Sequence, residues 1–349
     1  MRVFCFVTFF GVLIAFAGAQ ISLSDSQEKF RRELKAEYEN AEKKGAAACA
    51  ESGGWLFFAA EFRFLFLGRF WGDKAATVSR SRKPDSADPI PAIIDFQQQL
   101  KKRGIELLIV PVPPKAAIYP ERVVPGFDLR SDDPAPFLHQ FYEELRSAGV
   151  NLLDIGPRFI QNREDRRGPV FCRTDTHWSG FGCVVAAKAM AEAIQDKISD
   201  ITGSPERYVS EWKESPITGD LGPLLPSGAP KPGPERILLR AISEKENGGA
   251  VRPDPESPVL LLGDSHTLVF HDFLAERAGL VDQLAIELGF PPDVIGTRGS
   301  GATPVRINLY RHSLKKPEYL SKKRVVIWCF AAREFSEATE GWALIPVTK

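Results

Sequence analysis

Short apolar runs recur along the chain and alternate with longer segments that carry apolar residues on one helical face. Apolar runs of four to six residues are typical of strands buried on both sides of a sheet. The predicted strands cover residues 105–110, 150–153, 258–262 and 324–330, and the predicted helices cover residues 22–48, 93–102, 136–148, 179–198 and 267–277. This alternation predicts an α/β fold whose mostly parallel sheet is covered by helices on both faces.

Three segments complete the predicted organisation. The N-terminal helix has a capping-box pattern from Asp25 to Glu28, which favours a helix start at that point. The aromatic-rich stretch 54–71 is predicted to form strands packed on the core. Residues 202–256 are rich in Gly, Pro and Ser, and we expect a long excursion or a small subdomain there.

Composition narrows the class of protein. The 349 residues are 44% hydrophobic and 26% charged, which excludes a disordered chain, a collagen-like repeat and a multi-span membrane protein. Forty-five basic and 45 acidic residues cancel. No global field therefore attracts nucleic acid or anionic lipid, and no nucleic-acid partner is expected.

The N-terminus has the pattern of a secretory signal peptide. Met1-Arg2 precedes an apolar run, which ends in Ala17-Gly18-Ala19. This pattern favours cleavage after Ala19 and an extracytoplasmic or periplasmic protein, and the alternative is an uncleaved membrane anchor. The predicted organisation is a signal peptide at 1–19, a helical segment at 20–50 and one domain at 51–349 that contains the excursion 202–256.

Cysteine usage leaves several alternatives open. Four cysteines remain once the signal is removed: Cys49, Cys172, Cys183 and Cys329. An even number in an oxidising compartment permits disulfides, and the sequence does not choose among the three pairings. Cys329 lies in a strongly apolar strand and also fits a buried thiol. No pair has the C-x-x-C spacing of a metal site.

A serine follows the predicted strand 258–262, in the turn Gly263-Asp264-Ser265-His266. A serine between a strand and a helix is exposed at the sheet edge, and the backbone N–H groups of the helix start can stabilise an oxyanion. Ser265 is therefore a candidate nucleophile. The alternative is that Asp264 or Ser265 only caps a helix.

A serine nucleophile needs a base, and the base needs an orienting acceptor. Asp175 and His177 are two residues apart in an extended segment, which places both side chains on one side. The carboxylate can then hold one imidazole nitrogen and leave the other free as a proton acceptor. The alternatives are a fragment of a metal site, a structural histidine and a capping aspartate.

Several motifs together resemble the alginate O-acetyltransferase AlgX/AlgJ family, whose catalytic domain is SGNH-hydrolase-like. The motifs occur in family order from about residue 50 to residue 335: Gly54-Trp55-Leu56-Phe57, Val112-Pro113-Pro114-Lys115 with Tyr119-Pro120, Arg173-Thr174-Asp175-Thr176-His177-Trp178, Gly219-Asp220-Leu221, Leu262-Gly263-Asp264-Ser265, and Val326-Ile327-Trp328 with Arg333-Glu334. The Asp/His block precedes the serine, which is the permuted order of this family. The resemblance implies a flavodoxin-like three-layer sandwich.

The resemblance also implies roles for individual residues. Ser265 would be the nucleophile, His177 the base and Asp175 its orienter. For acyl transfer by these residues, we expect the oxyanion to be held by the Ser265 backbone N–H and by an N–H of Gly299 or Gly301, and the alternative is that the Gly299-Ser300-Gly301 segment is only a turn. Lys115, Tyr119 and Arg306 are candidates for contacts with an anionic or hydroxyl-rich polymer, and the alternative is that each is an ordinary surface or strand-end residue. Trp178 is expected to pack under His177 rather than to stack on sugar.

The implied activity is the O-acetylation of an exported polysaccharide through an acetyl-serine intermediate. Acetyl groups would arrive through a membrane-bound O-acyltransferase partner, and neither a cofactor nor a metal is expected. A carbohydrate acetylesterase with the same triad is the first alternative. A non-catalytic polysaccharide-binding subunit of an export complex is the second.

Overall fold

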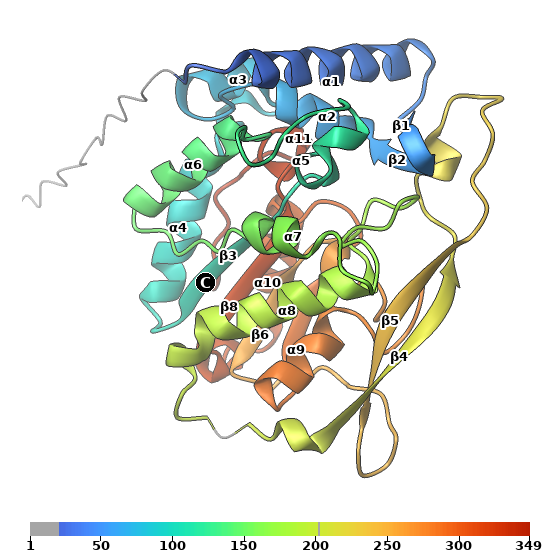
Figure 1. Cartoon of the computed structure of the whole chain (residues 1–349). Coiled ribbons are helices and arrows are strands. Elements are labelled where there is room, and N and C mark those ends of the chain that lie inside the picture. Colours follow the sequence, from blue (N-terminus) through green and yellow to red (C-terminus); the bar gives the residue numbers. More distant parts are fainter. Residues whose placement is uncertain (1–20, 202) are drawn as a thin grey trace, which may run out of the picture.

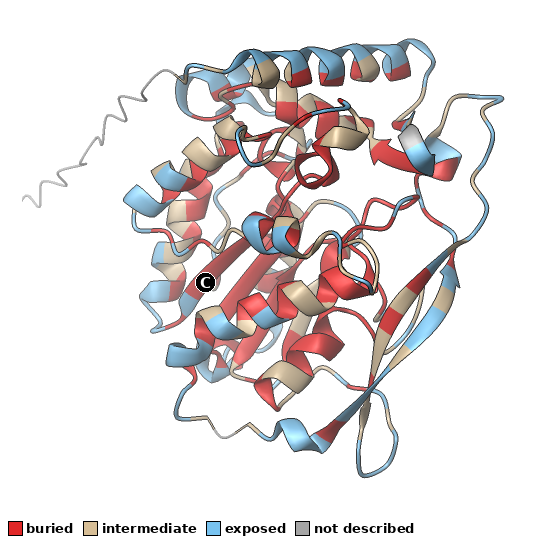
Figure 2. Ribbon diagram, viewed as in Figure 1, coloured by how far each residue is buried: buried red, intermediate tan, exposed pale blue. Residues whose placement is uncertain are grey.

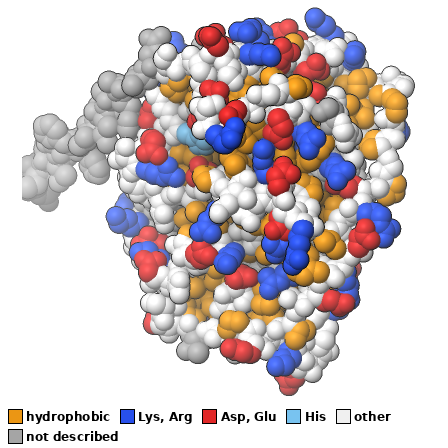
Figure 3. Space-filling model, viewed as in Figure 1, with side chains coloured by type: hydrophobic (Ala, Val, Ile, Leu, Met, Phe, Trp, Pro, Cys, Tyr) orange, Lys and Arg blue, Asp and Glu red, His pale blue; other side chains and the backbone are white. Residues whose placement is uncertain are grey.

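The computed structural model describes residues 21–201 and 203–349. The predicted signal peptide, residues 1–19, lies outside this part of the chain. Among the described residues, every helix is too short or too polar to cross a membrane. Acidic and basic side chains are interspersed over the face drawn in Figure 3, as the balanced composition predicts.

Four parallel strands form the central sheet in the order β3-β8-β6-β7 (Figure 1). Their bounds are Glu106–Val112 (β3), Val259–Gly263 (β6), Asp293–Gly296 (β7) and Val325–Ala331 (β8). β6 and β8 are buried along their whole length (Figure 2). The predictions for β3, β6 and β8 are confirmed, whereas segment 150–153 contributes only an isolated bridge between Leu152 and Ile109.

Helices cover both faces of the sheet and complete a three-layer sandwich, as expected (Figure 1). On one face, α8 and α9 pack together, and Cys183 of α8 lies near Cys329 of β8. On the other face, Phe96 of α4 and Arg306 of α10 contact the ring of Trp328. The bounds are Pro89–Lys101 (α4), Pro136–Ser147 (α6), Gly156–Asn162 (α7), Gly180–Ile194 (α8), Leu280–Leu288 (α9) and Thr303–Lys315 (α10).

The N-terminal part of the described chain forms a cap over one end of the sandwich (Figure 1). Helix α1 (Asp25–Lys43) packs on α2 (Ala59–Phe66), and β1 (Ala48–Glu51) pairs antiparallel with β2 (Trp55–Phe58). The capping box lies one residue earlier than predicted, because the Ser24 hydroxyl accepts from the Gln27 N–H. Three further short helices are Ala75–Val78 (α3), Lys115–Ile118 (α5) and Glu334–Glu337 (α11).

The aromatic stretch 54–71 forms one strand rather than several, so that prediction is largely wrong. After β2 the chain turns into helix α2. Ala59, Phe62 and Leu65 are buried there at intervals of three residues, which is a helical rather than a strand period. Aromatic residues occupy both the strand and the helix, so the sequence did not show where the strand period changes to the helical one.

The predicted helix 267–277 is also wrong. A short 3₁₀ turn spans Ser265–Thr267, and the next α-helix, α9, begins only at Leu280. Phe270, Leu274 and Arg277 have φ values of 62°, 64° and 64°. A left-handed backbone at these positions is incompatible with a continuous right-handed helix.

The excursion 202–256 contains a two-stranded antiparallel arm, formed by β4 (Tyr208–Ile217) and β5 (Glu235–Glu244). The arm packs on α8, where a Cβ on Gly180 would lie only 2.5 Å from the Leu239 side chain. The loop between the two strands, residues 218–234, returns to the carboxyl end of the sheet, where its Asp220 N–H donates to Asp175 Oδ2.

All four cysteines of the described chain are free thiols, so the disulfides permitted by the sequence do not form. Each thiol is buried, and burial raises the pKa of Cys49 to about 12. The pKa values of Cys172, Cys183 and Cys329 are raised well above the ordinary thiol value for the same reason. The alternative that Cys329 is a buried thiol is the one observed.

Candidate active site

Ser265 stands directly after β6, at the carboxyl edge of the central sheet. Gly263 is required there, because a Cβ at this position would lie 2.0 Å from the Cys329 carbonyl oxygen. The Asp264 carboxylate accepts from the His266 N–H at 2.9 Å and from the Ala331 N–H at 2.7 Å. These bonds tie the turn to the neighbouring strand β8 and hold Ser265 in place.

The structure brings the three expected catalytic side chains into one line. His177 Nε2 lies 2.8 Å from Ser265 Oγ, and His177 Nδ1 lies 2.6 Å from Asp175 Oδ1. The Asp175 carboxylate also accepts from the His177 backbone N–H at 2.9 Å. Ser265 is half-buried, whereas Asp175 and His177 are buried. An alcohol, an imidazole and a carboxylate in this order can activate the alcohol as a nucleophile.

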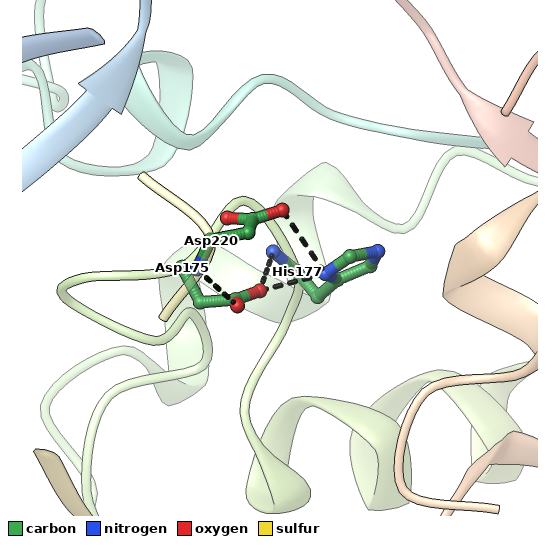
Figure 4. A group of neighbouring side chains, drawn as sticks. All are labelled: Asp175, His177 and Asp220. Carbon is green, nitrogen blue, oxygen red and sulfur yellow. Dashed lines mark hydrogen bonds and ion pairs between the residues drawn. The ribbon is translucent and has the colours of Figure 1, made fainter. Parts of the chain in front are cut away.

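Asp220 lies beside Asp175 and His177, and sequence reasoning did not place it there (Figure 4). It belongs to the loop between β4 and β5, and its backbone N–H donates to Asp175 Oδ2 at 2.9 Å. Its carboxylate accepts from the backbone N–H and the hydroxyl of Thr176, at 2.8 and 2.7 Å. A Cβ on Gly219 would lie 2.1 Å from the Thr174 carbonyl oxygen. The Gly219-Asp220 motif was noted in the sequence, but its spacing gave no indication of this contact.

Two further residues hold the segment that carries Asp175. Lys115 Nζ donates to the Asp175 carbonyl at 2.6 Å and to the Leu56 carbonyl at 2.9 Å. The Glu235 carboxylate, at the start of β5, accepts from the backbone N–H groups of Arg173 and Thr174. The segment around Asp175 and His177 is therefore held by Lys115 of α5, by Leu56 of the N-terminal cap, whose N–H donates to the Arg173 carbonyl at 2.8 Å, and by the β4–β5 arm.

Burial and the partner residue act in opposite directions on the pKa values in two acid–histidine pairs. Burial alone raises the pKa of Asp175, but the hydrogen bond and charge of His177 outweigh burial and lower that pKa below its ordinary value. For His266, burial lowers the pKa and the nearby Asp264 carboxylate only partly opposes it. The His266 imidazole is therefore favoured in its neutral form at neutral pH.

Asp175, His177 and Asp220 are close enough to hold a metal ion, since one ligand atom of each lies within 4.8 Å of the others. Their oxygens already accept hydrogen bonds, however. Asp175 is bonded by His177 and Asp220, and both oxygens of Asp220 are bonded by Thr176. These donors are the partners of an orienting carboxylate, so the arrangement favours a hydrogen-bonded triad over metal ligation.

A cleft of about 560 Å³ opens beside Ser265 and His177. Gly299 and Ser300 line it. Gly301 packs behind them, since a Cβ there would lie 3.1 Å from the Asp264 side chain. The segment expected to supply an oxyanion donor therefore lies against the Ser265 turn.

The three expected polymer contacts, Lys115, Tyr119 and Arg306, do not line this cleft, and neither does Trp178. Lys115 is 1% exposed and uses its ammonium on backbone carbonyls. Arg306, also 1% exposed, stacks among the rings of Phe96, Trp328 and Trp342. The buried Tyr119 hydroxyl accepts from the Val170 N–H at 3.0 Å. Trp178 is buried against the ring of His266, not that of His177. Sequence polarity did not reveal that these side chains point into the core.

A three-layer α/β sandwich with a Gly-Asp-Ser turn at the end of a central strand defines the class of SGNH-hydrolase-like proteins. The chain belongs to one family of this class, described as "SGNH hydrolase-like domain, acetyltransferase AlgX", whose model matches residues 51–332. The resemblance predicted from the motifs is thereby confirmed.

Curated relatives carry the name "Probable alginate O-acetylase AlgJ". The protein of Pseudomonas fluorescens is 29% identical over 263 residues, which are 70% of this chain and 62% of that one. The protein of Pseudomonas syringae pv. tomato is 31% identical over 192 residues, which are 52% of this chain and 48% of that one. The matched part thus spans less than two thirds of these relatives' length.

Two solved structures share the fold. The O-acetyltransferase domain of Pseudomonas putida AlgJ has a TM-score of 0.61 and 24% identity, over 83% of this chain and 92% of that one. Pseudomonas aeruginosa AlgX has a TM-score of 0.59 and 16% identity, over 90% of this chain and 70% of that one.

Proposed function

We propose that this protein is a polysaccharide O-acetyltransferase that works through an acetyl-serine intermediate on Ser265. The observation that carries the proposal is the continuous line from Asp175 through His177 to Ser265, with successive distances of 2.6 and 2.8 Å. Membership of the acetyltransferase family supports the choice of acetyl as the transferred group.

In the first half of the reaction, Ser265 Oγ attacks the carbonyl carbon of an acetyl ester while His177 Nε2 accepts the serine proton. The carbonyl π electrons move to oxygen and form a tetrahedral oxyanion. The intermediate then collapses, the bond to the donor oxygen breaks, and His177 returns the proton to that leaving oxygen. Asp175 keeps the Nδ1 proton on the imidazole and stabilises the imidazolium between the two proton transfers.

The oxyanion needs hydrogen-bond donors that are in place before it forms. We assign this role to the Ser265 backbone N–H and to an N–H of the Gly299–Gly301 segment, which lies beside the Ser265 turn. Each such donor lowers the barrier by about 3 kcal/mol in comparable sites.

In the second half, a sugar hydroxyl gives its proton to His177 and attacks the acetyl-serine. The bond between the acetyl carbon and Ser265 Oγ breaks, and the serine oxygen recovers the proton. The relatives' names point to an alginate-type polymer as the acceptor. The predicted export signal at residues 1–19 fits an extracytoplasmic site of action, with acetyl groups supplied through a membrane-bound O-acyltransferase.

Incubation of the purified protein with 4-nitrophenyl acetate and an alginate oligosaccharide tests this proposal. We expect acetylated oligosaccharide by mass spectrometry, and an acetyl group on Ser265 when the acceptor is left out. Free acetate without acetylated sugar would assign the protein as an esterase. Ser265→Ala should abolish both products, and unchanged sugar acetylation in that variant would overturn the proposal.

A further inference from the structure

Arg333 lines the same cleft as Ser265 and His177. It follows β8, which pairs in parallel with β6, the strand that leads to Ser265. Both residues therefore stand at the carboxyl edge of adjacent strands. The Arg333 side chain is 15% exposed, and it forms part of the lining of the cleft.

The Arg333 guanidinium is held from behind. One of its NH groups donates to Glu61 Oε1 at 3.2 Å, and its central carbon lies 5.2 Å from the centre of the Phe58 ring. Glu61 is buried and 4% exposed. A guanidinium that is stacked on a ring and paired on one side loses little further freedom when a ligand binds.

Most of the hydrogen-bonding capacity of Arg333 is unused. A guanidinium carries five N–H donors, and the bond to Glu61 is the one that Arg333 makes within residues 21–201 and 203–349. Neighbouring carboxylates already accept hydrogen bonds from other groups: Glu61 from the Lys115 N–H, Asp220 from Thr176, Asp264 from the His266 and Ala331 N–H groups, and Glu334 from the Ser300 hydroxyl.

The other arginine of the cleft provides a contrast. Arg80 also lines the space, but its guanidinium lies 3.3 Å from Glu42 Oε1 and 3.5 Å from Glu337 Oε2, and it bonds to the Tyr38 hydroxyl. Arg80 is thus occupied by residues of the protein. Arg333 therefore commits fewer of its guanidinium donors to residues of the protein than Arg80 does.

We propose that Arg333 binds the carboxylate of an acidic sugar in the acceptor and so selects a uronate polymer over a neutral one. The proposal rests on the acetyltransferase function proposed above and names the acceptor class. The planar guanidinium fork matches the two oxygens of a carboxylate, whereas a lysine ammonium offers only a point charge. The charged sugar would thereby be anchored beside the acetyl-serine.

The test uses binding and transfer with two matched acceptors, an alginate oligosaccharide and the same oligosaccharide with its carboxyl groups reduced to alcohols. Affinities are measured by calorimetry in a Ser265→Ala background, which removes chemistry. Arg333→Met should weaken binding of the acidic acceptor about 10- to 100-fold and leave the neutral one nearly unchanged. Arg333→Lys, which retains a partner for Glu61, should lose less affinity.

Transfer is then measured in the chain with Ser265 intact. We expect kcat/KM for the acidic acceptor to fall in Arg333→Met by about the same factor as affinity, and kcat/KM for the neutral acceptor to fall much less. Equal losses for both acceptors, or a parallel loss of ester cleavage in Arg333→Lys, would overturn the proposal. Arg158→Met, at an exposed ion pair with Glu192, controls for removal of a charge.

Failure of this inference and failure of the proposed function give different results. An active transferase that binds both acceptors equally before and after the change at Arg333 overturns this inference alone. A protein that binds the acidic acceptor through Arg333 but never acetylates it supports the anchor and overturns the transferase.

Discussion

Two Asp-X-His tripeptides lie face to face in this structure, with the two imidazole rings 4.8 Å apart. In Asp175-Thr176-His177 and in Asp264-Ser265-His266, the first carboxylate oxygen accepts from the histidine backbone N–H at 2.9 Å. The second oxygen accepts from the N–H of another segment, Asp220 in one case and Ala331 in the other. The local geometry of the two tripeptides is therefore nearly the same.

Their surroundings differ. The far nitrogen of His177 meets the Ser265 hydroxyl at the cleft. The His266 ring packs instead against Trp178 and His177, and burial lowers its pKa. The tripeptide thus fixes an acid–histidine pair but not its role, which depends on what the second imidazole nitrogen reaches. In the proposed mechanism the first pair moves a proton, whereas Asp264 of the second pair holds the turn that carries Ser265.

The largest expected effect separates the two histidines. We expect His177→Gln to lower kcat for acetyl transfer by about 10⁴- to 10⁶-fold, because the proton acceptor of Ser265 is lost. His266→Gln should lower kcat less than about tenfold and cost about 1 to 3 kcal/mol of stability. Transfer kinetics and urea unfolding of both variants measure these effects. Equal kcat losses would show that the two pairs do not differ in role.

The next effect separates the two aspartates. Asp175→Asn should reduce kcat by about 10³- to 10⁴-fold, because the amide favours the wrong imidazole tautomer. Asp264→Asn places an amide against the Ala331 N–H, so unfolding free energy should fall by about 1 to 3 kcal/mol and kcat by a smaller factor than in Asp175→Asn. If Asp264→Asn had the larger kinetic effect, the assignment of roles would be reversed.

A smaller effect is expected for Asp220, which holds the segment of Asp175 and His177. Asp220→Ala removes the acceptor of both Thr176 hydrogen bonds but leaves the backbone N–H that binds Asp175. We expect kcat to fall about tenfold with little change in KM, since the acid–histidine segment is held less firmly. Glu211→Ala, at an exposed position on the same β4–β5 arm, is the matched control. An unchanged kcat in Asp220→Ala would show that the other anchors suffice.

The smallest effect concerns acid stability. The pKa values of Asp175 and Asp264 are lowered because their histidine and backbone hydrogen bonds and charges outweigh burial. Such a group stabilises the fold above its unfolded pKa of about 3.9, and the stabilisation is lost as the pH falls through the folded value. Between pH 6 and pH 3 the free energy of unfolding, measured with urea, should therefore fall less steeply in Asp264→Asn than in the unaltered protein. A steeper fall in Asp264→Asn would contradict the lowered pKa of Asp264.

The sequence predicted the central strands and the triad because both depend on short local patterns. Apolar runs predict buried strands, and the position of Ser265 after one of them predicts its place at the sheet edge. Asp175 and His177 are two residues apart, so an extended segment aligns them. That Ser265 and His177, 88 residues apart, would meet was inferred from the family resemblance and not from spacing.

The sequence did not predict the residues that act from other layers. Asp220 and Glu235 contact the catalytic segment only because the β4–β5 arm folds back onto it. Lys115 and Arg306 are charged, and charge alone suggested exposed substrate contacts. In the structure both side chains are buried: the Lys115 ammonium donates to two backbone carbonyls, and the Arg306 guanidinium stacks among aromatic rings. The pattern of polar residues along the sequence does not distinguish such buried charges from exposed ones.

The four sulfhydryl groups have a practical consequence. Because none of these four is cross-linked and all are buried with raised pKa values, we expect the fold of residues 21–201 and 203–349 to tolerate reductant. An alkylating reagent should then modify them only in molecules that open. Mass-resolved alkylation would therefore report how often each layer of the sandwich opens, without any engineered probe.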